Sequence, residues 1–135
     1  MRITLLSLAF VIAGSAFSTL AAAEPAAKTR VFEMRTYHTH PGRLDALNKR
    51  FREHTNKYFV RHGMELVGYW TPQDKKDTLV YILAFPSREA ATASWKAFSA
   101  DPDWKKAQAE SEKDGKIVAK VESVFLDPTD YSPIK

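Results

Sequence analysis

Three side chains capable of acid–base chemistry occupy alternate positions in the stretch EMRTYHTHPG, residues 33–42. They are Glu33, Arg35 and Tyr37. Because alternate residues of a β-strand point to the same face, a strand here sets the carboxylate, the guanidinium and the phenol side by side. The spacing allows a charge-assisted pair between Glu33 and Arg35. We interpret the pattern as the polar wall of a small-ligand pocket. The alternative is a structural ion pair that fixes the register of an interface.

Two histidines, His38 and His40, end the same stretch and share a face by the same alternation. Such a pair can bind zinc, copper or iron only with a third ligand, which His54 or His62 could supply. No spacing of carboxylates or histidines supports that ligand set, so we expect no metal here. His54 falls on the apolar face of a predicted helix and is a candidate base; the alternative is a core histidine held by one hydrogen bond.

Aromatic residues form a second group of candidates. Trp70, Trp95 and Trp104 lie in apolar segments, where packing in a core or an interface is the usual role of tryptophan. Trp70 and Tyr81 could line a cavity instead, because each lies on a predicted strand with two faces. The expected ligand-binding residues are therefore Glu33, Arg35, Tyr37, His54, Trp70 and Tyr81.

The strands and helices that position these side chains follow from periodicity and turn residues. Their order, β-α-β-β-α-(α)-β, predicts an α+β ferredoxin-like fold, an antiparallel sheet with helices on one face. Ser87 is the expected cap of a helix that begins at Arg88. Asp101-Pro102 has the sequence of another helix start, with aspartate as the cap. The predicted strands are 30–39, 64–70, 78–85 and 116–126, and the predicted helices are 43–62, 88–100 and about 103–113.

The second face of such a sheet needs a cover. We expect Phe32, Met34 and Thr36 to pack under the helices, which leaves Glu33 and its neighbours on the uncovered face. No segment is left over to cover that face, so a second copy of the chain is the expected partner. The polar residues then line the interior between two sheets in a homodimer.

The first 23 residues have the composition of a cleavable signal peptide. Arg2 is followed by an almost uncharged stretch, and Ala21-Ala22-Ala23 supplies small residues before Glu24. An uncleaved membrane anchor is the alternative, and no second apolar run of spanning length follows it. We therefore expect a periplasmic or secreted protein, with residues 24–30 as a flexible lead and residues 31–135 as one domain.

Composition excludes several classes of function. Lys and Arg number 20 and Asp and Glu 16, and the two signs are mixed, so no nucleic-acid-binding stripe is indicated. The chain has no cysteine, which excludes thiol catalysis, zinc–thiolate sites and disulfides. It also has no nucleophile elbow and no phosphate-binding glycine loop. No catalytic set is complete, and whether the protein is an enzyme stays open.

Several blocks of the sequence resemble the NIPSNAP family. They are VFEMRTYHTHPGRLDAL, HGMELVG with the following YWTP, FPSREAATASWKAFSADPDWKKA and SVFLDPTDYSPIK, and the resemblance covers residues 31–135. It implies a dimeric α/β barrel, in which two ferredoxin-like sheets pack face to face, and it implies no defined activity. Mitochondrial members of the family are tied to vesicles and mitophagy, a setting from which a bacterial-type signal peptide departs.

Two functions fit these patterns. The first is a homodimeric small-ligand-binding module with a polar pocket and no cofactor. The second is a cofactor-free or haem-linked small-molecule enzyme of monooxygenase or isomerase type, which rests on analogy between folds. An interaction protein of the cell envelope would need an apolar patch on its exposed helices, and the sequence indicates none.

Overall fold

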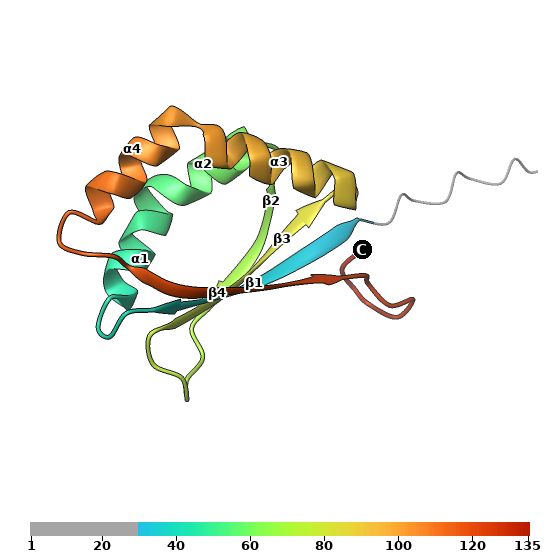
Figure 1. Ribbon diagram of the computed structural model, residues 1–135. Helices are drawn as coiled ribbons and strands as arrows, with labels where there is room; N and C mark the ends of the chain where they lie inside the picture. The colour runs from blue at the N-terminus through green and yellow to red at the C-terminus, as the bar shows by residue number, and fades with distance from the viewer. Residues whose placement is uncertain (1–29) are drawn as a thin grey trace, which may run out of the picture.

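A computed structural model describes residues 30–135 and is shown in Figure 1. The predicted signal peptide, residues 1–23, lies outside the described residues, and so does all but the last residue of the predicted lead. Within the described part of the chain, no helix is long and apolar enough to cross a membrane.

Four antiparallel strands form one sheet. Their order across the sheet is β2-β3-β1-β4, so the first strand lies between the third and the fourth, as in a ferredoxin-like fold. Figure 1 shows the helices together on one side of this sheet. The predicted fold class is confirmed, whereas the pairing of two sheets stays a prediction. The strands are β1 (Val31–Thr39), β2 (Glu65–Trp70), β3 (Thr78–Phe85) and β4 (Val118–Leu126).

The first helical region is continuous but changes its winding in the middle. It consists of α1 (Leu44–Arg50), a π-helical segment η1 (Phe51–Thr55) and α2 (Asn56–Arg61). A π-helical turn takes more residues than an α-helical turn, so it rotates the residues that follow it relative to an ideal helix. The sequence predicted its extent well but not this rotation. Thr55 is buried, while the side chain of His54 is 35% exposed and does not lie in the core.

The second helical region consists of α3 (Arg88–Ala100) and α4 (Pro102–Ser111). Both begin at the predicted caps. The Ser87 hydroxyl accepts a hydrogen bond from the Ala90 N–H, and the Asp101 carboxylate accepts from the N–H groups of Asp103 and Trp104. Each cap satisfies backbone donors that the first turn leaves without partners.

The hydrophobic core lies between the sheet and the helices. Phe51 of the first helical region packs edge-on against Phe59 and against Tyr81 of β3, and Phe59 makes tilted contacts with Tyr81 and with Phe98 of α3, with ring centroids 4.9–6.0 Å apart. Edge-to-face contacts of this kind add to the stabilisation from burial of apolar area. Leu47, Leu83 and Ile117 are fully buried around these rings.

The two faces of β1 are the reverse of the prediction. Glu33, Arg35 and Tyr37 point toward the helices, since Glu33 contacts Trp95 of α3 and Tyr37 packs on Phe51. Alternation therefore puts Phe32, Met34 and Thr36 on the sheet face away from the helices, here called the open face. The prediction failed because alternation separates two sets of residues but does not say which set meets the helices. The open face also carries Val80, Ile82, Val124 and Leu126, which pair in register with these β1 residues.

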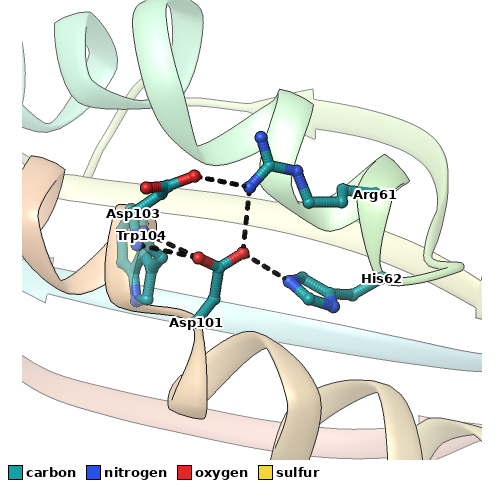
Figure 2. Close-up of polar contacts among 5 residues, drawn as sticks. All are labelled: Arg61, His62, Asp101, Asp103 and Trp104. Carbon is teal, nitrogen blue, oxygen red and sulfur yellow. Dashed lines mark hydrogen bonds and ion pairs between the residues drawn. The ribbon is translucent and has the colours of Figure 1, made fainter.

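A buried carboxylate joins the two helical regions, as Figure 2 shows. Asp101 Oδ2 lies 2.7 Å from His62 Nε2 and 3.2 Å from Arg61 Nη1, so the end of α2 is tied to the cap of α4. Asp101 Oδ1 accepts the two backbone hydrogen bonds of the cap. The hydrogen bond from His62, together with the backbone N–H groups and Arg61, lowers the pKa of Asp101 to about 2.

Replacement of Asp101 by Asn should lower the thermal unfolding midpoint by several degrees near neutral pH, because the charged acceptor of His62 and Arg61 is lost. The folded-state pKa is below the ordinary value of 3.8, so the carboxylate stabilises the fold above about pH 4 and loses this effect as the pH falls to about 2. The midpoint of Asp101→Asn should therefore depend less on pH across that interval than the wild type.

Asp103→Asn is the matched control, because Asp103 contacts the same Arg61 from an exposed position. Circular dichroism melts at several pH values compare the three proteins. Equal losses of stability in the two variants would show that the Asp101 junction has no special role.

Candidate functional site

A cavity of about 680 Å³ lies between the sheet and the helices. Arg35 and Tyr37 of β1 and Val121 of β4 line it from the sheet, and Arg50, Phe51 and Thr55 line it from α1 and η1. The other wall comes from α3 and α4. Small-molecule sites have volumes of about 300–1,000 Å³, so the cavity has the size of a ligand site. The residues from α3 and α4 are Trp95, Phe98, Ser99, Trp104, Lys105 and Gln108.

The cavity is accessible along β4. Val121 and Ser123 pair with Tyr37 and Arg35, so they share the face that carries the helices. Both are nevertheless exposed, and Val121 lines the cavity. The helices thus cover β1 and β3 more fully than they cover β4, and the uncovered part of the sheet is the entrance.

Glu33 organises the sheet side of the site. Its buried carboxylate accepts a hydrogen bond from Trp95 Nε1 at 2.5 Å and one from Ser123 Oγ at 2.6 Å. Arg35 Nε lies 3.7 Å from the same carboxylate. A buried charge is costly unless it is paired and hydrogen-bonded, and here β1, β4 and α3 each supply a partner. The Glu33–Arg35 ion pair that the sequence predicted is present, but it lies inside the monomer.

The guanidinium of Arg35 is stacked on aromatic rings. Its guanidinium carbon lies 4.0 Å from the centroid of the Trp95 ring and 5.7 Å from that of Tyr37. The side chain lines the cavity and is 19% exposed. Within residues 30–135, no acceptor forms a hydrogen bond with this guanidinium. The group therefore keeps its donors available to a ligand while stacking restrains its position.

Arg50 has a different environment on the opposite wall. Its side chain is 3% exposed, and its Nη1 donates to Glu112 Oε1 at 3.0 Å. This pair joins α1 to the residue after α4 and neutralises the carboxylate that lines the cavity. Lys105 and Lys116 also line the cavity, and no described carboxylate lies within ion-pair distance of either. The cavity thus carries excess positive charge.

The phenols behind Arg35 belong to the core. Tyr81 is fully buried, packs 5.3 Å from the Tyr37 ring and does not line the cavity. Its hydroxyl has no hydrogen-bond partner among the described residues. Burial raises the pKa of Tyr81 well above its ordinary value, so the phenol stays protonated. Tyr69, stacked on Tyr81, has its pKa raised in the same way and donates to Asn56 Oδ1 at 2.9 Å.

The structure brings together only part of the predicted set. Arg35 and Tyr37 line the cavity, with Glu33 and Tyr81 directly behind them. His54 instead lines a separate hollow between η1 and the end of α4. Trp70 lies at the end of an edge strand, 52% exposed on the open face, with its ring over the Cα of Gly68.

The two histidines at the end of β1 lie away from the cavity. His38 Nε2 is 3.1 Å from Glu122 Oε1, and His40 is exposed. In residues 30–135, no group of three or more His, Cys, Asp or Glu side chains could hold a metal ion.

Sequence reasoning missed four polar residues of the cavity: Arg50, Lys105 and Gln108 on the helices, and Lys116 in the connection between α4 and β4. One signal was present, because Arg50 follows Leu47 by three residues in an otherwise apolar row. A charged residue in such a row is buried with a partner or lines a cavity. The two lysines carry no such signal, since they lie in a segment rich in charged residues.

Comparison with known proteins gives a consistent result. The sequence model of the NIPSNAP family matches residues 32–133. A NIPSNAP family protein of unknown function from Agrobacterium tumefaciens is 25% identical, with a TM-score of 0.70 over 80% of this chain and 96% of that chain. No curated protein matches this chain.

Two further solved structures show the same fold. An uncharacterized NIPSNAP domain protein from Burkholderia xenovorans is 24% identical, with a TM-score of 0.66 over 76% of this chain and 98% of that chain. SnoaB, a cofactor-independent oxygenase from Streptomyces nogalater, is 17% identical, with a TM-score of 0.53 over 78% of this chain and 98% of that chain.

The Glu33 contacts predict a graded series of stabilities. Arg35→Ala should cost about 3 kcal/mol, because a buried carboxylate loses its counter-charge but keeps two neutral donors. Trp95→Phe removes one donor to a charged group and should cost about 1.5–3 kcal/mol. Ser123→Ala removes the other donor and should cost less, since water can reach this exposed position. Urea unfolding measures all three, and a silent Arg35→Ala would contradict the buried ion pair.

Proposed function

This chain belongs to the NIPSNAP family, and we propose that it binds a small organic molecule in the cavity between its sheet and its helices. The observation that carries the proposal is the cavity itself, about 680 Å³ in volume, lined by aromatic rings together with a few cationic side chains. Apolar walls with a small number of fixed polar groups are what ligand sites of this size need.

The lining of the cavity is held in place before any ligand binds. Trp95 is fixed by its hydrogen bond to Glu33, and Arg35 is stacked on Trp95. Arg50 is fixed by Glu112. The π-helical segment η1 supplies Phe51 and Thr55 to the same wall, and π-helical turns are frequent at functional sites. A preformed site loses less conformational entropy on binding, which favours affinity.

The alternative is catalysis in the same cavity, by a cofactor-free or haem-linked enzyme. Among the described residues, no histidine lines the cavity, because His54 lies in a separate hollow. The histidine that the sequence offered as a candidate base is therefore not in this cavity. The likeness to an oxygenase is one of fold. Ligand binding is the function that the geometry supports best.

Two neighbouring positions on α3 offer a test. Ser99 lines the cavity, whereas Ala97 is exposed outside it. Native mass spectrometry of protein purified from its source should show a bound small molecule, released on denaturation. Ser99→Trp should fill the cavity and abolish the adduct, and Ala97→Trp should retain it. Wild-type protein that carries no adduct, and whose unfolding midpoint no compound of a metabolite library raises, would overturn the proposal.

We further propose that the protein is a homodimer through the open face of its sheet. Val124 is 45% exposed there and lies beside Met34 and Leu126 on neighbouring positions. Burial of a few hundred Å² of apolar area at roughly 25 cal/mol per Å² stabilises an interface by several kcal/mol. A second copy presents the same apolar face, so the surface is self-complementary.

Sedimentation velocity at micromolar concentration should show a dimer for the wild type. Val124→Glu should shift the protein to a monomer, because it buries unpaired charge in the interface. Val121→Glu is the matched control, since it places the same charge on the same strand but on the face with the cavity. A monomeric wild type, or dissociation by both substitutions alike, would count against this interface.

A further inference from the structure

We propose that the ligand of the cavity is an organic anion with a flat apolar body, whose acidic group binds at Arg35. This inference rests on the proposed ligand-binding function and specifies the chemical class of the ligand. A carboxylate is the simplest acidic group of this kind, and a sulfonate presents oxygens of the same geometry.

Arg35 is arranged to receive two oxygens. Trp95 restrains the plane of its guanidinium at 4.0 Å, and Glu33 lies on its Nε side at 3.7 Å. No described residue accepts a hydrogen bond from it, although the side chain is mostly buried. A guanidinium with free donors matches a carboxylate in a bidentate arrangement. A ligand oxygen would thus supply the acceptor that the protein does not.

The remaining charges of the cavity favour the same class of ligand. Glu112 is its only lining carboxylate among the described residues, and Arg50 is bound to it. Glu33 lies behind Arg35 and offsets its charge in part. Lys105 and Lys116 add positive charge with no carboxylate near them. Arg35 is mostly buried, so its charge is screened less than the charge of the two exposed lysines, and the three cations together favour an anion over a neutral or cationic ligand.

The aromatic lining of the cavity indicates which shape is favoured for the rest of the ligand. Trp95, Phe98 and Trp104 form one side, and Tyr37 and Phe51 the other. Such rings provide flat apolar surfaces at a low cost in conformational entropy, and they stack well on a planar ligand. In this proposal a flat apolar body packs against the accessible parts of these rings while its acidic group reaches Arg35.

Two fluorescent probes separate charge from shape. 8-Anilino-1-naphthalenesulfonate is a flat aromatic anion, and N-phenyl-1-naphthylamine is the same body without the sulfonate. The wild type should bind the anion at least about tenfold more tightly than the neutral probe, a factor expected for a charge-assisted hydrogen bond. A rise in salt from about 0.01 M to about 1 M should lower the affinity for the anionic probe more than the affinity for the neutral probe.

Substitutions locate the binding site. Arg35→Gln should lower the affinity for the anionic probe about tenfold and leave the affinity for the neutral probe unchanged. Arg35→Lys should have an affinity for the anionic probe between those of the wild type and Arg35→Gln. Lys105→Gln removes a positive charge of the cavity at an exposed position, where the substitution does not endanger folding. It should lower the affinity for the anionic probe severalfold. Lys106→Gln, its neighbour outside the cavity, should not. Ser99→Trp should exclude both probes.

The failures of the two proposals differ. If the wild type binds the two probes with equal affinity and Ser99→Trp binds neither, the anionic class is overturned, while ligand binding in the cavity still holds. The anionic class is also overturned if Lys105→Gln and Lys106→Gln weaken binding of the anion to the same extent. If neither probe binds, or if Ser99→Trp still binds both, the anionic class is overturned, and the adduct in native mass spectrometry decides ligand binding separately.

Discussion

A single buried carboxylate determines much of this arrangement. Glu33 sits on a central strand beneath a helix, where an ionised group is costly unless every partner is in place. Its two hydrogen bonds come from α3 and β4, and its ion pair comes from the same strand. The position of α3 over the sheet, the pairing of β4 and the orientation of Arg35 are therefore linked. A shift of any one of them leaves a buried charge without a partner.

The cavity exists because α4 is positioned by other helices. Its first turn is tied to α2 through Asp101 and His62, and the residue after its last turn is tied to α1 through Glu112 and Arg50. Both ends are thus fixed to the first helical region. The sheet below α4 is left uncovered along β4, which gives both the volume and the entrance. These two ion pairs therefore also fix the position of α4 over the sheet, in addition to their contribution to stability.

The π-helical segment decides which residues of the first helical region reach the cavity. An extra residue in the turn places Phe51, Thr55 and Phe59 toward the sheet and the cavity, and it leaves His54 on the flank. In an ideal α-helix, His54 follows Leu47 and Phe51 into the apolar row. One local change of winding therefore exchanges an imidazole for a hydroxyl at the wall of the site.

Local patterns in the sequence determined the order of the elements, their bounds to within a few residues and the caps of α3 and α4, because strand alternation, helical spacing and cap chemistry act over a few residues. They also singled out Glu33, Arg35 and Tyr37 as a group. Only the tertiary structure decided which way the group points. Alternation is symmetric between the two faces of β1, and the choice depends on Trp95 and Ser123, which are 62 and 90 residues away. The lysines of the cavity also depend on the fold, since Lys105 lies in what reads as a solvated helix and Lys116 lies at the start of a predicted strand, and only the placement of α4 over the sheet brings both to the cavity.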